Sequence, residues 1–230
     1  MHASDKEVIV ELSAIKKSYQ LGQTEVPALR GIDLQIFRGE FTAVVGTSGS
    51  GKSTLLNLIG CIDEPDSGSI RFDGQEVQDL SDEQRTSLRN RKIGFIFQSF
   101  NLVPVLNVYE NVELPLLINR DVPAKERHKR IMDALSDVGL ADFHHHLPDQ
   151  LSGGQRQRVA IARALAGQPD LVLADEPTAN LDSDNSHKII ELMQDLNARR
   201  KITFLFSTHD ERLMNRVKRI VKIRDGVIHH

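Results

Sequence analysis

The sequence predicts an α/β fold with a mainly parallel sheet, and three features of the 230-residue chain lead to this prediction. Nearly continuous apolar runs at residues 41–45, 171–174 and 202–207 are typical of strands that are buried on both faces. Segments with helical apolar spacing separate these runs, which favours parallel strands joined by helices. The composition, with 40% apolar and 27% charged residues, is that of a globular chain able to bury such a core.

The first part of the chain is predicted to form antiparallel strands. Residues 7–15 and 32–36 alternate between apolar and polar side chains, and a turn is expected at residues 38–40. A strand at 41–45 and a helix at 52–59 follow, with a glycine-rich turn between them. The chain therefore begins with a β-rich front lobe that leads into a strand–loop–helix unit.

The middle of the chain is predicted to become helical. A short strand at 69–72 and a polar helix at 81–91 precede a strand at 93–97. From residue 107 to residue 140 the apolar side chains recur at helical spacing, and Pro123 fits the first turn of a helix there. This change of pattern indicates a helical insertion.

The last third returns to alternating helices and strands. A helix that ends near residue 166 precedes the strand at 171–174, and a helix at 183–199 precedes the strand at 202–207. A last strand is expected near residues 220–223.

The whole chain, residues 1–230, is expected to form one domain. Residues 1–98 and 166–230 are predicted to make up the core with its β-rich lobe, and residues 99–165 an inserted helical subdomain.

Charge, cysteine content and hydropathy exclude several classes of function. The 29 basic and 32 acidic residues give a net charge of −3 and are interspersed, so we expect no nucleic-acid partner. The single cysteine, Cys61, cannot form an internal disulfide. No apolar stretch approaches the ~20 residues needed to cross a bilayer, and residues 1–7 do not resemble a secretory signal. A cytoplasmic location is therefore expected.

Residues 46–53 fit the phosphate-loop pattern G-x-x-x-x-G-K-[ST] and lie between a predicted strand and a predicted helix. Glycine lets backbone N–H groups converge on phosphate oxygens, and the helix N-terminus adds its positive dipole end. Lys52 brings charge to the β and γ phosphates, and the Ser53 hydroxyl suits Mg²⁺. The alternative is a flexible glycine turn, but four fixed positions in this context favour nucleotide binding. The expected binding residues are Gly46, Thr47, Ser48, Gly49, Ser50, Gly51, Lys52, Ser53 and Thr54.

Two carboxylates follow the apolar strand at 171–174. Asp175 is expected to face the Mg²⁺ shell, and Glu176, one residue on, to orient the attacking water or accept its proton. A solvated pair of acids at a strand end is the alternative. The phosphate loop favours the catalytic interpretation.

A second small-residue helix start occurs at residues 151–155, Leu-Ser-Gly-Gly-Gln. Ser152 can cap the helix, and the free N–H groups beside Gly153 and Gly154 form a second anion site, with Gln155 next to them. Alone, this segment would indicate a plain capped helix.

Taken together, these segments resemble the nucleotide-binding subunit of an ATP-binding-cassette (ABC) transporter. Residues 151–155, here called the signature segment, match the signature pentapeptide of that family and end 20 residues before Asp175. The resemblance covers nearly the whole chain. It implies a P-loop NTPase core, ATP and Mg²⁺ as cofactors, and hydrolysis of ATP to ADP and phosphate.

The resemblance also implies roles for residues outside these motifs. Tyr19 is similar to the aromatic residue that stacks on adenine, Gln98 to the glutamine that meets Mg²⁺ and the attacking water, and His209 to the histidine that contacts the γ phosphate. A surface tyrosine, a loop amide and a helix-capping histidine are the respective alternatives. The implied catalytic residues are Glu176, His209, Gln98 and Lys52, and the implied metal residues are Ser53, Gln98 and Asp175. Residues 179–182 match the loop that crosses between subunits, with Ala179 and Asn180 as mild departures.

In this family two copies pack head to tail, so the signature segment is expected to serve the ATP of a second copy in a homodimer. Residues 95–104 and 107–116 look most like the lipoprotein-releasing and macrolide-exporting branch. That branch implies an integral membrane permease, contacted through residues 98–116, and a peripheral position on the cytoplasmic face of the inner membrane.

Other functions, both in transport and outside it, stay open as alternatives. An importer subunit or the cell-division relative would differ in the membrane partner. A soluble cassette ATPase that acts on DNA ends or ribosomes would need a long coiled-coil insertion or a second cassette, and the sequence has neither. The run His144, His145 and His146 suggests a metal site, but adjacent side chains diverge and no further ligand completes a set, so we expect a solvated loop.

Overall fold

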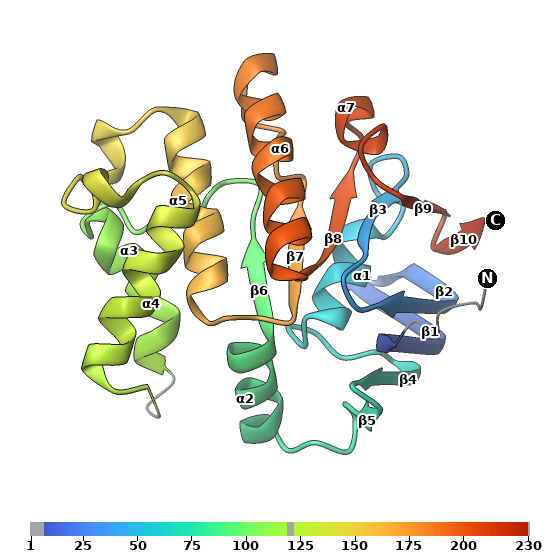
Figure 1. Ribbon diagram of the computed structural model, residues 1–230. Coiled ribbons are helices and arrows are strands. Elements are labelled where there is room, and N and C mark those ends of the chain that lie inside the picture. Colours follow the sequence, from blue (N-terminus) through green and yellow to red (C-terminus); the bar gives the residue numbers. More distant parts are fainter. Residues whose placement is uncertain (1–6, 119–121, 230) are drawn as a thin grey trace, which may run out of the picture.

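A computed structural model describes residues 7–118 and 122–229 of the chain. Two sheets form the body, with one helix between them and a group of helices on the far side of the larger sheet (Figure 1). This arrangement confirms the predicted α/β fold with a mainly parallel sheet and an antiparallel front lobe.

The front lobe is a four-stranded antiparallel sheet of order β2-β1-β4-β5. Its strands are β1 (Val8–Leu21), β2 (Thr24–Phe37), β4 (Ser67–Phe72) and β5 (Gln75–Glu76). β1 extends past the expected end because it continues to pair with β2 as far as the hairpin turn, where most of its side chains are exposed or half-buried. An alternating apolar pattern marks only the half-buried part of such a strand.

The larger sheet has six strands in the order β10-β9-β3-β8-β7-β6, parallel except for β10, which is antiparallel to β9. The strands are β3 (Phe41–Val45), β6 (Ile93–Ile96), β7 (Leu171–Asp175), β8 (Thr203–Thr208), β9 (Arg219–Arg224) and β10 (Val227–His229). The sequence did not predict β10, because its three residues are exposed or half-buried and carry no pattern.

The helices are α1 (Lys52–Ile59), α2 (Asp82–Lys92), α3 (Val108–Ile118), α4 (Ala124–Asp137), α5 (Gly153–Ala166), α6 (Ser183–Arg200) and α7 (Glu211–Met214), with 3₁₀ turns at Ala141–Phe143 and Pro148–Gln150. The predicted helical stretch 107–140 thus contains α3 and α4, and residues 119–121 lie outside the described part. Pro123 directly precedes α4 and is not inside its first turn. None of the helices within the described ranges is long and apolar enough to span a bilayer.

The larger sheet separates two hydrophobic clusters because its side chains alternate between faces. On β8, Phe204 and Phe206 belong to the cluster that packs against α3 to α6, whereas Leu205 belongs to the cluster around α1 and the front lobe. On β7, Val172 and Leu173 divide in the same way. Burial on both faces explains why these strands are continuous apolar runs.

Buried Asn111 on α3 fixes the second half of the loop between β6 and α3. Its Oδ1 accepts the N–H of Val103 at 2.8 Å, and its Nδ2 donates to the carbonyls of Val103, Leu106 and Asn107 at 3.1, 2.8 and 2.9 Å. One side chain therefore replaces the backbone hydrogen bonds that this irregular segment lacks. The ordered loop presents Val105, which is 80% exposed, at the surface.

Candidate functional site

A cavity of about 630 Å³ lies at the carboxyl ends of β3, β7 and β8, beside the N-terminus of α1. Ligands of open parallel sheets bind at this edge, where the strands end and helix N-termini begin. The residues that line the cavity are Tyr19, Ala28, Gly46, Thr47, Ser48, Gly49, Gly51, Lys52, Ser53, Thr54, Gln98, Asp175, Glu176 and His209. The structure therefore brings together most of the site residues that the sequence predicts. Ala28 is the member that the sequence did not suggest.

Two glycines of the phosphate loop are required by the surrounding protein. A Cβ atom on Gly46 would lie 2.2 Å from the carbonyl oxygen of Ile223, and one on Gly51 would lie 2.6 Å from that of Ala28. Gly51 also has a φ of +103°, in the region that favours glycine. The loop thus packs closely against β9 and β2. These two glycines are needed for that packing as well as for the expected approach of phosphate to the backbone N–H groups.

Lys52 lies almost fully buried at the start of α1. Its Nζ donates to the carbonyl oxygens of Gly46 at 2.9 Å and Thr47 at 3.0 Å. These bonds hold the ammonium group over the loop. An anionic ligand that enters the cavity can replace one of the two carbonyl oxygens as its hydrogen-bond acceptor. The side chain of Ser50, by contrast, is buried and does not line the cavity.

Ser207, a fully buried residue of β8, holds the carboxylate of Asp175 and the backbone of Glu176 at the end of β7. Its Oγ donates a hydrogen bond to Oδ1 of Asp175. The N–H of Glu176 donates to Ser207 Oγ at 3.2 Å and to the Ser207 carbonyl oxygen at 3.0 Å. The sequence analysis missed Ser207, although a serine inside the apolar run of β8 was a signal that could have been used.

Glu176 has an unusual backbone conformation and a histidine partner. Its φ is +47°, a left-handed value that a residue with a long side chain seldom adopts and that is commonly found at functional sites. Its Oε1 lies 2.8 Å from Nδ1 of His209, whose side chain is 73% exposed. The carboxylate is therefore directed into the cavity beside an imidazole that is open to a ligand.

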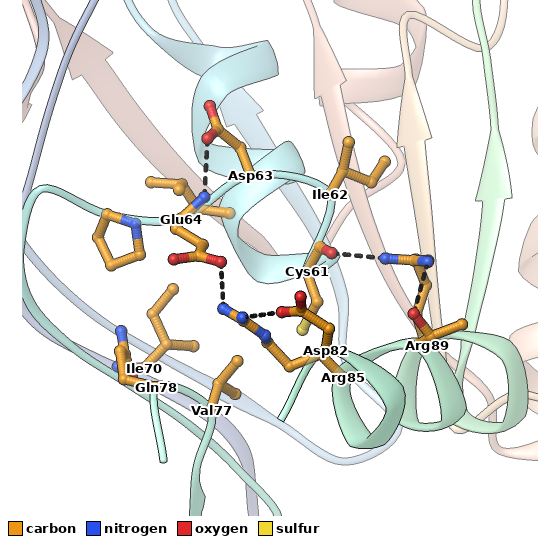
Figure 2. A pocket seen from close by; sticks show the side chains of 13 residues that line it. Cys61, Ile62, Asp63, Glu64, Ile70, Val77, Gln78, Asp82, Arg85 and Arg89 are labelled. Carbon is orange, nitrogen blue, oxygen red and sulfur yellow. Dashed lines mark hydrogen bonds and ion pairs between the residues drawn. The ribbon is translucent and has the colours of Figure 1, made fainter. Parts of the chain in front are cut away.

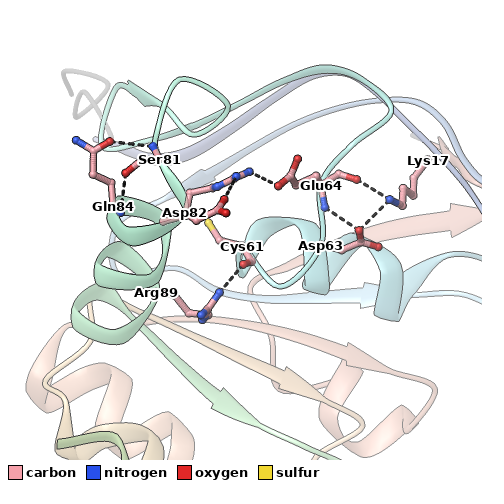
Figure 3. Close-up of polar contacts among 9 residues, drawn as sticks. Lys17, Cys61, Asp63, Glu64, Ser81, Asp82, Gln84 and Arg89 are labelled. Carbon is pink, nitrogen blue, oxygen red and sulfur yellow. Dashed lines mark hydrogen bonds and ion pairs between the residues drawn. The ribbon is translucent and has the colours of Figure 1, made fainter. Parts of the chain in front are cut away.

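Tyr19 is held in place from the loop that follows α1. Its hydroxyl donates to Oδ2 of Asp63 at 2.7 Å. The Nζ of Lys17 donates to Oδ1 of Asp63 at 2.8 Å and to the carbonyl oxygen of Glu64 at 2.7 Å (Figure 3). Partial burial opposes ionisation of Asp63, but the hydrogen bonds from Lys17 and Tyr19 outweigh it and keep the pKa of Asp63 below its usual range. Asp63 is a second residue that sequence reasoning missed.

The same loop is tied to α2 around a smaller cavity of about 220 Å³ (Figure 2). Arg85 bridges Glu64 and Asp82, and Nη1 of Arg89 donates to the carbonyl oxygen of Cys61 at 2.8 Å. Burial raises the pKa of the Cys61 thiol to about 11, which leaves it protonated and unreactive. These contacts hold the loop that carries Asp63, and through Asp63 they orient Tyr19.

The signature segment lies outside the cavity of its own chain. Ser152 caps α5 as predicted: the Gln155 N–H donates to Ser152 Oγ at 3.3 Å, and the Ser152 N–H donates to Gln155 Oε1 at 2.9 Å. A Cβ atom on Gly154 would lie 2.7 Å from Oδ1 of Asn185, so this glycine lets α5 approach α6. One copy of the chain therefore does not bring its signature segment to its own phosphate loop.

The histidine run 144–146 forms no metal site. Within the described ranges, no group of three or more His, Cys, Asp or Glu side chains is arranged to hold a metal ion. The rings of His144 and His145 lie 3.9 Å apart, so the expectation that adjacent side chains of the run diverge was wrong for this pair. The carbonyl oxygens of His144 and His146 accept the N–H groups of Tyr109 and Val108. The backbone of this segment thus caps the start of α3.

Comparison with known proteins places the chain in a family. The sequence model described as "ABC transporter" matches residues 29–179. An ABC transporter ATP-binding protein of Thermotoga maritima is 50% identical over 96% of this chain and 93% of its own length. The lipoprotein-releasing system ATP-binding protein LolD 1 of Rhodopseudomonas palustris is 46% identical over 96% and 98%.

A macrolide export ATP-binding/permease protein, MacB, of Syntrophobacter fumaroxidans is 50% identical over 96% of this chain, but the match spans only 31% of that longer protein. Among solved structures, the cassette MJ0796, known from Methanocaldococcus jannaschii, has a TM-score of 0.87 and 44% identity. The match covers 96% of this chain and 97% of that one. MJ0796 has been solved as a dimer, in one case bound to ADP and Pi.

Proposed function

Since the chain belongs to the ABC transporter family, as an ATP-binding and ATP-hydrolysing cassette of the branch that includes LolD and MacB, we propose that it is the motor subunit of a lipoprotein-releasing or export system. It would bind two ATP molecules between two copies and drive a separate membrane subunit. The observation that carries this proposal is the separation of two anion-binding surfaces in one chain. The phosphate loop lines the cavity, and the signature segment lies elsewhere.

A head-to-tail homodimer would unite these surfaces. Ser152 is exposed at the N-terminus of α5, where free N–H groups and the helix dipole favour an anion. A closed twofold arrangement uses each surface twice, once per bound nucleotide. MJ0796, which is 44% identical to this chain, has been solved as a dimer, and this supports the pairing of two copies.

The cavity residues fit ATP together with Mg²⁺. Ser53, Gln98 and Asp175 line the same space and offer hydroxyl, amide and carboxylate oxygens, the donors that Mg²⁺ prefers, and Ser207 already orients Asp175. Mg²⁺ held there would neutralise charge on the phosphates. Lys52 would contact the β and γ phosphates, Glu176 would take a proton from the attacking water, and His209 would contact the γ phosphate while it orients Glu176.

Tyr19 is expected to bind adenine through the face of its ring. Stacking on an aromatic residue contributes about 1–3 kcal/mol per base, so Tyr19→Ala should weaken ATP binding roughly 10-fold. Tyr19→Phe keeps the ring but loses the bond to Asp63, and its affinity should stay within about threefold of the wild type. Titration with a fluorescent ATP analogue compares the two variants, and equal losses in both would contradict stacking.

The membrane partner is proposed to dock on the surface formed by residues 98–116, which would place the protein on the cytoplasmic face of the inner membrane. Val105, 80% exposed on a backbone that Asn111 holds rigid, is the most exposed apolar side chain of this surface. A preordered apolar contact loses little conformational entropy when a partner binds.

Co-purification with a candidate membrane permease subunit tests the proposed partner surface. Val105→Asp is expected to reduce the amount of subunit retained at least 10-fold, because a carboxylate would be buried without a partner. Leu21→Asp, at the tip of the β1–β2 hairpin where Leu21 is 67% exposed, serves as the control and should retain it. Equal retention by both variants would rule out this docking surface, and a co-purified importer-type subunit would rule out the export assignment.

A further inference from the structure

The loop that carries Gln98 has a strained backbone beyond β6. Phe100 and Asn101 have φ values of +59° and +50°, so two consecutive residues with side chains adopt the left-handed conformation. Each such residue is less stable there than in the ordinary regions, and the conformation persists only where neighbouring groups hold it. The structure must therefore contain contacts that fix this turn.

Arg163 of α5 supplies those contacts. Its Nη2 donates to the carbonyl oxygen of Phe100 at 2.7 Å, and its Nη1 donates to that of Asn101. The guanidinium of Arg156, about two turns earlier on the same face of α5, lies 5.5 Å from the centre of the Phe100 ring. The planar fork of an arginine bonds two adjacent carbonyls through two separate nitrogens in a fixed geometry, which the single ammonium nitrogen of a lysine does not reproduce.

The charged guanidinium of Arg163 loses part of its hydration where it makes these bonds. Burial lowers the pKa of its guanidinium, and the two hydrogen bonds described go to neutral carbonyls, which do not balance its charge. A charge in this setting is better explained by a positioning role than by packing, because an apolar side chain of similar length could fill the space.

The bonds from Arg163 to the loop bear on the position of Gln98. Gln98 lines the ATP cavity two residues before Phe100, and its carbonyl oxygen accepts a hydrogen bond from Nδ2 of Asn180 at 2.8 Å. Two contacts therefore hold the loop. Asn180, in the segment before α6, bonds Gln98, and Arg163 of α5 bonds the two residues with positive φ. Without Arg163 the strained turn can relax, and Gln98 would leave its place in the cavity.

We propose that Arg163 is a positioning residue for ATP hydrolysis, which acts by holding Gln98 in the cavity. The same helix, α5, begins in the signature segment about 15 Å from Arg163 at 1.5 Å per residue, so it contacts the Gln98 loop and also carries the surface proposed to face the second copy. This inference rests on the proposed role of Gln98 in the hydrolysis of ATP.

A double-mutant cycle on the full chain separates positioning from a general effect on the fold. Arg163→Lys keeps the charge but replaces the rigid two-nitrogen fork with a single ammonium nitrogen on a flexible stem, and we expect kcat to fall roughly 10-fold with the KM for ATP changed by less than about twofold. In a Gln98→Ala background the same substitution should change kcat by less than about twofold, because the residue through which Arg163 acts is gone. Arg158→Lys, on the same helix and bonded to the Val138 carbonyl, is the matched control and should affect neither background.

Several results would overturn the inference. Equal losses of kcat in the wild-type and Gln98→Ala backgrounds would show that Arg163 acts independently of Gln98, and an unchanged kcat in Arg163→Lys would show that it has no role. If thermal unfolding shows that Arg163→Lys does not fold, Arg163→Gln enters the same cycle, since it removes the buried charge and keeps an amide donor. Failure of the wild type to hydrolyse ATP would contradict the proposed function instead.

Discussion

Glu176→Gln is expected to lower the rate of ATP hydrolysis roughly 10²–10⁴-fold, the range associated with loss of a general base. The glutamine side chain keeps the size of the glutamate and can still contact His209, but it cannot accept a proton from water. The backbone of residue 176 stays fixed by Ser207, so the cavity should keep its shape. ATP binding should therefore persist while turnover stops.

The dimer state of Glu176→Gln provides the second part of this prediction. If hydrolysis separates the two copies, a variant that binds ATP without hydrolysing it should accumulate as a dimer, which light scattering during gel filtration would detect. Glu191→Gln, at an exposed position on α6, is the control and should behave as the wild type. Wild-type turnover by Glu176→Gln would remove Glu176 from its proposed role.

Lys52→Met is expected to weaken ATP binding by roughly 10²-fold, since a hydrogen bond to a charged group contributes about 1.5–3 kcal/mol and the wild-type ammonium would also neutralise phosphate charge. Methionine fills much of the same buried space, so α1 should remain folded. The bonds from Nζ to the Gly46 and Thr47 carbonyls are lost, which leaves the loop less ordered.

Calorimetric titration with ATP and with adenosine distinguishes a charge effect from a general loss of the site. The Lys52→Met effect should be large for ATP and small for adenosine, because only the triphosphate reaches residue 52. Lys188→Met, an exposed lysine on α6, is the control. Similar losses for both ligands would instead indicate that the cavity has collapsed.

Several parts of the fold could be predicted because the chemistry that determines them is local in the sequence. The run at 41–45 and the glycine-rich turn after it define β3 and the phosphate loop, and Ser152 three residues before Gln155 marks a capping box. Strands buried on both faces leave a continuous apolar run, so β7 and β8 were also predictable. The exposed strand β10 leaves no such pattern.

The supporting contacts of the site could not be predicted, because they join residues far apart in the sequence. Tyr19 and Asp63 are 44 positions apart, and Ser207 and Asp175 are 32 apart. No local pattern tells which buried polar group will meet which partner. A polar residue inside an apolar strand, such as Ser207, signals only that some partner must exist.

The signature segment was expected, from the family resemblance alone, to serve the ATP of a second copy, and it does not line the cavity of its own chain. Gly153 offers a way to probe its function with little damage to the fold. A Cβ atom there would lie 3.6 Å from Leu181, an ordinary contact, and an aspartate in the first turn of a helix is compatible with the helix dipole. Gly153→Asp would nevertheless place a negative charge where the second copy's triphosphate is proposed to bind.

Mixing two inactive variants tests most directly whether ATP is shared between two copies. Lys52→Met disables the phosphate loop and Gly153→Asp disables the signature segment, so each variant alone should be inactive. In a head-to-tail dimer of the two, one site combines both intact surfaces, and random pairing should restore roughly a quarter of wild-type ATP hydrolysis. Activity of the mixture that does not exceed the sum of the separate variants would contradict the shared site.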